Sequence, residues 1–299
     1  MIDLYEKLKT ITNEENILKD EPMSKHTTFR TGGNADFYVT PESINELEKI
    51  LEITKDIVVL GNGSNVLVTD KGIRGIVVSL RKLNKYVIEN DKIIADSGIP
   101  IVKLSHIAAE NDLSGLEFAC GIPGTLGGAL YMNAGAYGSE MKDVVISTKY
   151  LDVNTLEIKT LNGNENEFAY RESIYSKNIN GIILGAEIQL IHKNNEEIYE
   201  KMNENMQHRN SKQPVDKPSA GSTFKRQEGV IAAKLIDDAG LKGYRIGGAE
   251  VSTLHAGFIV NIDNATSKDI LDLIEYVKKV VYEKYDVLLE PEVKIIGEL

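Results

Sequence analysis

Residues 115–138 point most strongly to chemistry, because they hold seven of the chain's 25 glycines. Glycine weakens helices and strands and adds no side chain to a core. This density therefore indicates backbone that approaches a ligand closely or takes positive φ. Backbone amides are then the main donors, and Pro123, which fits the first turn of a short helix, would add a helix N-terminus that suits an anionic cofactor. A Gly/Ala-rich helix packed closely on a neighbour is an equally open interpretation.

A second glycine-containing turn, residues 61–65, directly follows the apolar run 57–60. It begins like the dinucleotide-binding pattern GxGxxG, but Val66 stands where the last glycine belongs, and the residues after it favour a strand over a helix. The amides and small polar side chains of such a turn can form an anion-binding nest. An ordinary hairpin turn is the alternative.

Three polar positions could act on a substrate. Arg171 follows Tyr170 at an expected strand-to-helix junction, Ser222 lies at the end of a Pro/Gly-containing loop, and Glu292 interrupts an apolar strand. A surface ion pair, a turn serine and an edge-strand acid are the simpler interpretations. These positions are 51 and 70 residues apart, so spacing alone cannot place them in one site.

Several other chemistries lack support. The five histidines show no ligand spacing, so we expect no metal site. Cys120 lies among apolar and glycine residues and is expected to pack rather than react. There is no GxSxG elbow and no Gly-Lys dipeptide, which argues against a serine hydrolase and a P-loop.

The elements that must position these residues follow from hydrophobic periodicity, and the fold class they indicate is α+β with more than one domain. The strand, helix and strand between residues 35 and 60 form an expected right-handed crossover. We expect helices over 2–20, 41–51, 101–111, 194–209, 230–239 and 266–285, and strands over 35–40, 57–60, 66–69, 73–97, 144–161, 181–191, 244–262 and 288–297.

Composition narrows the setting. A length of 299 residues favours two or three domains, and a net charge of -11 argues against a general nucleic-acid role. A single cysteine excludes an internal disulfide and indicates a reducing compartment. We see no signal peptide and no apolar run near the ~20 residues that cross a bilayer. We therefore expect a cytoplasmic protein that neither binds nucleic acid nor inserts into membranes. We also expect a monomer, although composition does not determine the oligomeric state.

Seven stretches, in order along the chain, together resemble the UDP-N-acetylenolpyruvoylglucosamine reductase (MurB) family. They are residues 27–33, 61–65, 121–128, 133–138, 170–173, 220–225 and 290–294. Each stretch alone is a weak signal, but seven in the family's order are specific. The resemblance extends from about residue 24 to the end of the chain.

The resemblance implies a fold and a reaction. It implies a two-subdomain FAD-binding fold of the PCMH/vanillyl-alcohol-oxidase type over residues 1–80 and 81–195, and an α+β substrate domain over 196–287. The terminal strand 288–299 would return to the first subdomain. It further implies non-covalent FAD, NADPH as co-substrate, and reduction of the enolpyruvyl ether of UDP-N-acetylglucosamine to UDP-N-acetylmuramate in peptidoglycan synthesis.

The resemblance also assigns roles to residues. Hydride would come from flavin N5 and a proton from Ser222, while Arg171 and Glu292 would stabilise the enolate that forms. Tyr170, Lys225 and Arg226 would contact the substrate. The flavin contacts would be Arg30, Thr31, Gly32, Gly61, Asn62, Gly63, Ser64, Asn65, Gly121, Ile122, Pro123, Gly124, Thr125, Gly128, Ala129, Asn133, Ala134, Gly135, Ala136 and Gly138.

Two departures from the family pattern matter. One subclass carries an insert with a substrate-covering tyrosine after the strand that here ends near Ile191, and this chain lacks it, so it resembles the shorter subclass. Many relatives have Asn-Pro where Arg226 and Gln227 stand here. Because no Rossmann fingerprint is present, we expect NADPH and the sugar nucleotide to use one cleft in turn. Another FAD oxidoreductase on the same scaffold, or a binding protein without turnover, is the alternative.

Overall fold

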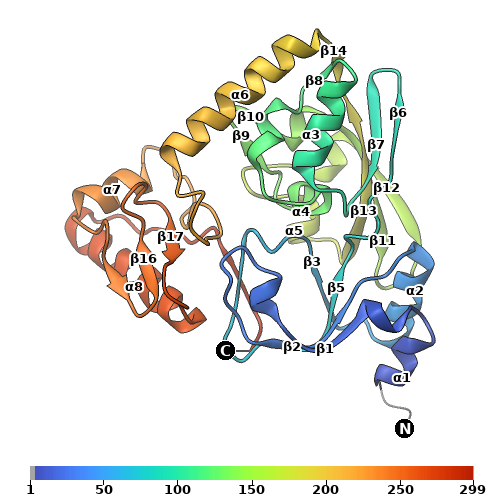
Figure 1. Cartoon of the computed structure of the whole chain (residues 1–299), viewed down its shortest axis with the longest axis horizontal. Coiled ribbons are helices and arrows are strands. Elements are labelled where there is room, and N and C mark those ends of the chain that lie inside the picture. Colours follow the sequence, from blue (N-terminus) through green and yellow to red (C-terminus); the bar gives the residue numbers. More distant parts are fainter. Residues whose placement is uncertain (1–3, 299) are drawn as a thin grey trace. The chain divides into compact units, whose positions relative to one another are not determined.

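Two units, each with its own hydrophobic core, are built from alternating segments of the chain (Figure 1). The computed structural model describes residues 4–298. Unit one comprises the chain up to Lys19, Phe37–Asn62 and Gly75–Gln207. Unit two comprises Asp20–Asp36, Gly63–Arg74 and the chain from His208 onward. The three-part division at residues 80, 195 and 287 stays a prediction.

The core of unit one lies against a five-stranded antiparallel sheet. Its order is β12 (Ile158–Asn162), β11 (Val145–Asp152), β13 (Gly181–Gln189), β7 (Lys92–Asp96) and β6 (Tyr86–Glu89). Helices α3 (Ile101–Glu110) and α4 (Leu126–Tyr131) bury their apolar residues in the same core as strand residues Ile93 and Ile188. The glycine-rich stretch, which contains α4, is thereby anchored in this core through residues such as Phe118, Leu126 and Leu130.

A four-stranded sheet contains the predicted crossover. Its order is β1 (Ile17–Pro22), β2 (Asn34–Val39), β5 (Ile73–Ser79) and β3 (Ile57–Leu60), with α2 (Ile44–Ile53) between β2 and β3. Strand β3 pairs in parallel with β5 rather than with β2. Its register sets Leu60 opposite Ser79, so the chain leaves the sheet directly into the turn at residue 61.

The N-terminal helix is shorter than predicted. The prediction began at Ile2, outside the described residues, and ran to residue 20, whereas α1 covers only Leu4–Lys9. A 3-10 turn at Glu14–Asn16 and strand β1 follow. The β-branched pair Ile11 and Thr12 weakens a helix. Strand β1 is stabilised by hydrogen bonds to β2 in the sheet. Helical periodicity in the sequence cannot predict such a contact between distant segments.

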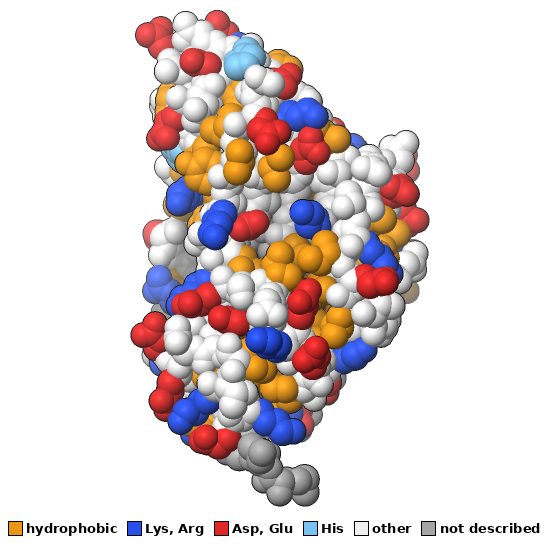
Figure 2. Space-filling model, turned by 90° about the vertical axis from the view of Figure 1, so that its right-hand side faces the viewer, with side chains coloured by type: hydrophobic (Ala, Val, Ile, Leu, Met, Phe, Trp, Pro, Cys, Tyr) orange, Lys and Arg blue, Asp and Glu red, His pale blue; other side chains and the backbone are white. Residues whose placement is uncertain are grey.

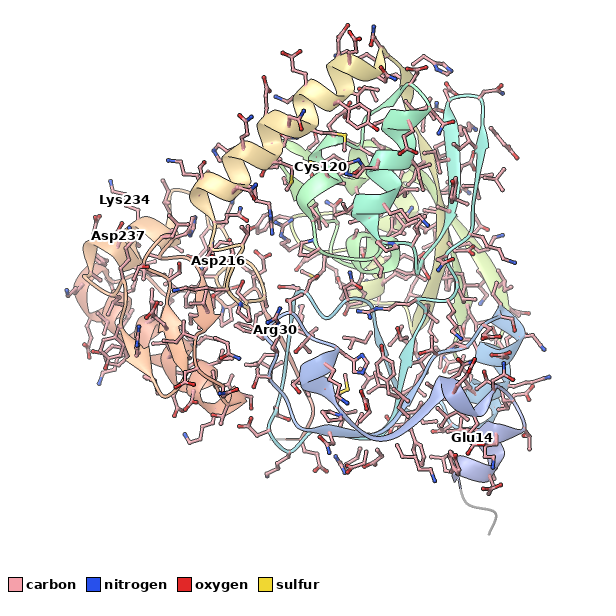
Figure 3. All side chains as sticks on the ribbon, viewed as in Figure 1. Glu14, Arg30, Cys120, Asp216, Lys234 and Asp237 are labelled. Carbon is pink, nitrogen blue, oxygen red and sulfur yellow. The ribbon has the colours of Figure 1, made fainter. Side chains whose placement is uncertain are left out.

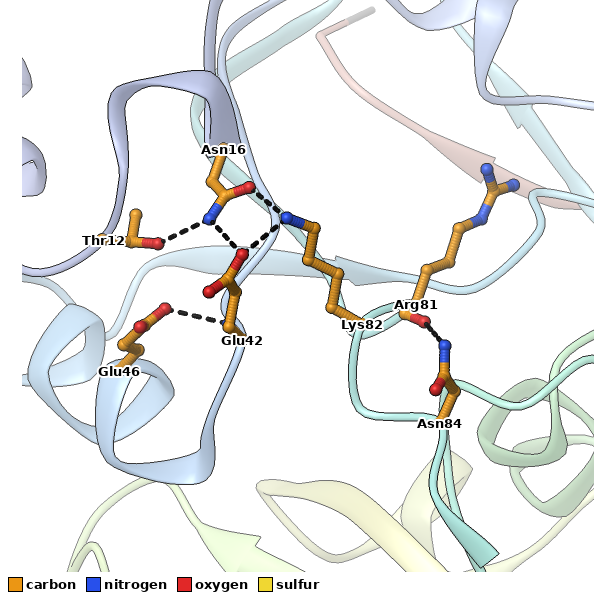
Figure 4. A network of polar contacts seen from close by, with 7 residues as sticks. All are labelled: Thr12, Asn16, Glu42, Glu46, Arg81, Lys82 and Asn84. Atoms are coloured by element: carbon orange, nitrogen blue, oxygen red, sulfur yellow. Dashed lines mark hydrogen bonds and ion pairs between the residues drawn. The ribbon is translucent and has the colours of Figure 1, made fainter.

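Figure 4 shows how the start of β1 is tied to neighbouring loops of unit one. Lys82 Nζ donates to Asn16 Oδ1 at 2.6 Å and to Glu42 Oε1 at 2.7 Å. The Asn16 amide donates in turn to Thr12 Oγ1 at 2.9 Å. The hydrogen bond from Lys82 lowers the pKa of Glu42. Because Asn16 is buried, this network satisfies an amide that would otherwise cost stability.

Unit two packs helices α7 (Ala232–Asp238) and α8 (Ser267–Tyr285) on a small antiparallel sheet of β15 (Arg245–Ile246), β16 (Ala249–Val251) and β17 (Ile259–Asn261). Thr266 caps α8 through a capping box with Asp269. The predicted terminal strand 288–297 is regular only as β18 (Lys294–Ile296). It pairs in parallel with β4 (Val66–Val68), so the turn at residues 61–65 is not a hairpin.

The first part of helix α6 (Asn195–Lys212) packs over Cys120, the single cysteine of the sequence. Ile198 and Met202 pack with Ala109 and Cys120, and Cys120 Sγ lies 3.6 Å from the Met202 carbonyl oxygen (Figure 3). Cys120 as a whole is 4% exposed. This burial agrees with the prediction that Cys120 packs in the core.

Charged side chains of both signs alternate over the face drawn in Figure 2. Hydrophobic side chains lie between them in small groups on this face. Among the described residues 4–298, no helix is both long and apolar enough to cross a membrane.

A hairpin turn in unit one gives a pH-dependent contribution to stability. Lys159 Nζ lies 2.7 Å from Asp152 Oδ2, and this hydrogen bond, with those from the amides of Thr155 and Asn154, lowers the pKa of Asp152 from 3.8 to about 2. A lowered carboxyl pKa adds stability that is fully present above pH 3.8 and is lost as the pH falls toward 2. We therefore expect Asp152→Asn to lower Tm by a constant amount above pH 4 and by less toward pH 2. Thermal melts across this range check the result, and a pH-independent difference would contradict it.

Candidate functional site

In unit one, the turn after β3 meets the glycine-rich stretch. Asn62 Nδ2 donates to the carbonyl oxygen of Pro123 at 3.2 Å, although the residues are 61 positions apart. A Cβ atom at Gly61 would stand 2.7 Å from Thr125 Oγ1, so a larger residue there forces a shift. Two of the stretches expected to hold the flavin are therefore neighbours, at a separation that only glycine permits.

The glycine-rich stretch enters α4 through Thr125. Its Oγ1 accepts a hydrogen bond from the Gly128 amide at 3.4 Å and caps the helix. Pro123 precedes the cap by two residues, so its predicted place in the first helical turn is wrong. Pairing of Thr125 with Pro100 determines where the helix starts instead. Gly128 is exposed at the first turn, where an added Cβ would have only Thr125 Oγ1, at 3.7 Å, within 4 Å.

The other predicted flavin contacts of unit one lie on either side of α4 or within it. Ala129 and Asn133 are buried, whereas Gly138 is exposed with a φ of +89° and no atom within 4 Å of an added Cβ. The set is Gly121, Ile122, Gly124, Ala129, Asn133, Ala134, Gly135, Ala136 and Gly138. Their flavin contacts stay predictions.

Arg171 lies in a tight turn that faces the end of the glycine-rich stretch. The turn is closed by paired backbone hydrogen bonds between Ala169 and Glu172, at 3.0 and 3.2 Å, and Arg171 has a φ of +56°. Arg171 Nη2 donates to the Gly135 carbonyl oxygen at 3.4 Å. Its guanidinium carbon is 5.3 Å from the ring centroid of Tyr170. An arginine fork of this kind suits a carboxylate ligand.

In unit two, the structure brings Ser222 and Glu292 onto neighbouring segments. Phe224 and Pro291 form an antiparallel bridge, and the Glu292 amide donates to the Thr223 carbonyl oxygen at 2.8 Å. The residue after Ser222 therefore pairs directly with Glu292. Glu292 is 9% exposed, whereas Ser222 is exposed and follows Gly221, whose φ is +77°. Two predicted catalytic residues that are 70 positions apart thus lie on adjoining backbone.

The remaining flavin candidates belong to unit two. Asn65 Nδ2 donates to the Glu292 carbonyl oxygen at 3.3 Å, and the Lys294 amide donates to the Asn65 carbonyl oxygen at 3.0 Å. A Cβ at Gly63 would stand 2.2 Å from the His26 carbonyl oxygen, so the turn also packs on the loop before β2. The candidates here are Arg30, Thr31, Gly32, Gly63, Ser64 and Asn65.

The loop before β2 holds an exposed arginine next to a buried threonine. Arg30 is exposed with a φ of +55° (Figure 3). Thr31 is buried, and its Oγ1 donates to the Ala265 carbonyl oxygen at 2.7 Å. Gly32 has a φ of +124°, and a Cβ there would stand 2.7 Å from the Val68 Cβ. Thr31 and Gly32 therefore fix the loop that presents Arg30.

Sequence reasoning missed the buried residue that anchors Ser222. Thr223 Oγ1 accepts from the Ile259 amide at 3.0 Å, and the Thr223 amide donates to the Gly257 carbonyl oxygen at 2.8 Å. The sequence offered no signal for this anchor, because its partners Gly257 and Ile259 are more than 30 positions away. Lys225 Nζ pairs with Glu290 Oε2 at 3.2 Å, and Arg226 is exposed.

His255, one of the five histidines, lies beside the Thr223 anchor, because both residues bind Gly257. Its Nδ1 accepts from the Gly257 amide at 3.1 Å, and burial lowers the pKa of its imidazole. The ring therefore stays neutral at physiological pH. Among residues 4–298, no three His, Cys, Asp or Glu side chains form a group that could hold a metal ion.

Comparison with known proteins gives two family matches and several long relatives. Residues 35–161 match the FAD binding domain, and residues 213–296 match the UDP-N-acetylenolpyruvoylglucosamine reductase C-terminal domain. The reductase of Caldanaerobacter subterraneus subsp. tengcongensis is 52% identical, over 99% of this chain and 98% of its own length. The chain belongs to the UDP-N-acetylenolpyruvoylglucosamine reductase family. The family reductase of Geobacillus thermodenitrificans is 49% identical over the same shares.

A crystal structure of a family reductase supports the fold as well. The enzyme from Thermus caldophilus matches with a TM-score of 0.82 and 33% identity, over 94% of this chain and 98% of its own. These matches confirm the family resemblance and the α+β fold class with an FAD-binding fold and a C-terminal domain. They do not bear on the individual site residues, which stay predictions.

The residues of unit one fit the flavin that this family binds. The contact between the turn at Gly61 and Asn62 and the stretch at Pro123 and Thr125 forms a backbone cradle that a side chain at position 61 would fill. Gly128 and Gly138 leave their own surroundings open. Such glycine-lined backbone can approach an anionic group as a larger residue could not.

Proposed function

We propose that this chain reduces UDP-N-acetyl-3-O-(1-carboxyvinyl)glucosamine to UDP-N-acetylmuramate, using FAD and NADPH, in the cytoplasmic part of peptidoglycan synthesis. The proposal rests on one observation above the others. The segments of Ser222 and Glu292 pair within unit two, in a chain that matches family reductases over nearly its whole length. We further propose that the enzyme acts as a monomer.

The cofactor would be held by backbone of the glycine-rich stretch and of the turn at Gly61 and Asn62. The chemistry that bound FAD supplies is hydride transfer to the terminal vinyl carbon, with NADPH as the source of the electrons. Negative charge then develops on the adjacent carbon and on the carboxylate of the substrate. Side chains of the protein must then bind that carboxylate and deliver a proton.

Arg171 is the proposed carboxylate ligand. Its guanidinium presents fixed, parallel donors, and such donors stabilise a transition state when they are aimed at developing charge. Stacking on Tyr170 and the hydrogen bond to Gly135 hold the side chain in place before the substrate arrives. This pre-organisation removes a reorganisation cost at the moment of reaction.

Ser222 is the proposed proton donor, and Glu292 is the proposed second stabiliser of the enolate. A serine hydroxyl is a weak acid, but it suits a strongly basic carbanion when it is held in position. The strand-like pairing from Thr223 to Lys225 supplies that position. Lys225 and Arg226, which follow on the same segment, are the proposed diphosphate ligands, and Tyr170 is a proposed substrate contact.

Steady-state kinetics test the proposed function. NADPH oxidation by the purified, FAD-loaded protein should depend on the enolpyruvyl substrate. Double-reciprocal plots of the initial velocity should give parallel lines, because the two substrates should use one cleft in turn. We expect a shared cleft because no second dinucleotide domain is predicted. NADPH oxidation that ignores the enolpyruvyl substrate would refute the activity. Intersecting lines would refute only the shared cleft.

A further inference from the structure

Asn133 is a fully buried asparagine directly after α4, in the glycine-rich stretch. Its φ of +42° lies in the left-handed region, which asparagine tolerates better than most residues. A buried side-chain amide must find partners within the protein, since each unpaired group costs about 1–3 kcal/mol. Its partners therefore indicate what the residue does.

The amide of Asn133 binds three places in unit one. Nδ2 donates to the Ala169 carbonyl oxygen at 3.0 Å and to Glu140 Oε2 at 3.0 Å, and Oδ1 accepts from the Lys142 amide at 2.9 Å. Both donor hydrogens and one acceptor position are thereby used by the protein. This assignment differs from the predicted flavin contact, because the polar side-chain atoms already have protein partners.

The bond to Ala169 ties the glycine-rich stretch to the turn that carries Arg171. Ala169 also closes that turn by exchanging backbone hydrogen bonds with Glu172, so the asparagine holds the first residue of the turn. A second tie runs from Ser173 Oγ to the Tyr131 carbonyl oxygen at 2.8 Å. The position of the turn relative to the stretch is thus defined on both sides of Arg171.

We propose that Asn133 is a positioning residue for Arg171: its side-chain amide holds the arginine turn at a fixed place against the flavin-binding stretch. The proposal rests on the proposed function, because Arg171 matters only if a substrate carboxylate must be bound. An arginine in the left-handed region is not a favoured conformation, so its turn needs such support. The polar side-chain atoms of Asn133 bind only protein partners in this arrangement.

The test uses Asn133→Asp in the FAD-loaded protein. This change keeps the volume and the acceptor but removes the donor, and it sets a carboxylate against Glu140 and the Ala169 carbonyl. We expect re-oxidation of the reduced flavin by the enolpyruvyl substrate to slow by about 10- to 100-fold, the order that a 1 Å misplacement costs. Flavin reduction by NADPH should slow far less. Stopped-flow absorbance of the flavin measures both steps separately.

A double-mutant cycle identifies the route of the effect. In an Arg171→Ala background, Asn133→Asp should slow re-oxidation little further, because the guanidinium that Asn133 positions is already absent. The same full loss in that background, or equal losses in both half-reactions, would overturn the proposal. If the Asp variant does not fold, Asn133→Gly, which suits the positive φ, takes its place in the cycle with the same expected outcomes.

Asn205→Asp is the matched control. Asn205 is also buried in unit one, and its Nδ2 donates to the Glu117 carbonyl oxygen at 3.0 Å. The control should lower Tm without a selective loss of re-oxidation, and a selective loss would overturn the proposal. If the proposed function is wrong, the wild-type protein itself will fail this assay, because the enolpyruvyl substrate will not re-oxidise its reduced flavin. That result is distinct from a loss confined to the Asn133 variant.

Discussion

Replacing Ser222 with alanine should slow re-oxidation of the reduced flavin by the enolpyruvyl substrate by about 10²–10⁴-fold, the usual contribution of a general acid. The hydroxyl is the proposed proton source for the carbanion, and alanine leaves the neighbouring pairing of Thr223 with Glu292 intact. Flavin reduction by NADPH should be nearly unchanged, because that step needs no proton on the substrate carbon. Single-turnover measurements of each half-reaction provide the result.

Ser219→Ala is the control for this variant, since Ser219 lies three positions earlier in the same loop and has no assigned role. Both variants should bind the enolpyruvyl substrate with similar affinity. If Ser222→Ala slows both half-reactions equally, Ser222 positions ligands and does not deliver the proton.

Arg171→Ala should slow the same re-oxidation step by about 10²–10³-fold, the range seen when one preorganised donor to developing charge is removed. Arg171→Lys keeps the positive charge but loses the planar fork, so it should recover only part of the rate. Substrate affinity should also fall for Arg171→Ala, because the carboxylate loses a ligand in the ground state. Titration of the oxidised enzyme with substrate, followed by flavin absorbance, measures this second effect.

Lys177→Ala is the control for the arginine variants. Lys177 pairs with Glu172 at 2.5 Å next to the same turn, and exposed ion pairs of this kind contribute little. Wild-type rates in this control, with a full loss in Arg171→Ala, would assign the effect to the guanidinium. An Arg171→Ala rate near wild type would remove Arg171 from the mechanism.

The elements with strong periodicity could be predicted from the sequence. Strand β3 covers the predicted residues 57–60, and α8 (Ser267–Tyr285) matches the helix predicted over 266–285. The failures arise where non-local contacts decide the structure. Strand β1 forms in a segment predicted to be helical because it pairs in a sheet, and Pro123 lies outside α4 because Thr125 pairs with Pro100.

The composition of the site could be proposed, but its internal geometry could not. The glycine density predicted backbone that approaches a ligand closely, and this stays a prediction. The structure adds a close approach within the protein itself, between Gly61 and the Thr125 side chain. The segments of Ser222 and Glu292 are joined by the pairing of Phe224 with Pro291 and of Thr223 with Glu292, and spacing in the sequence does not reveal such long-range contacts. The role of Asn133 depends on three hydrogen bonds that become visible only once Ala169, Glu140 and Lys142 are placed.

The parallel pairing of β4 with β18 has a consequence for synthesis on the ribosome. Val66–Val68 is made early, whereas its partner Lys294–Ile296 is made more than 220 residues later. At roughly 5–20 residues per second, this strand waits some tens of seconds with an unpaired edge. Glu292, which precedes β18, can pair with Thr223 only at that late stage. A nascent chain therefore cannot form this pairing until residue 292 has been made, and a chain truncated before residue 290 should never form it.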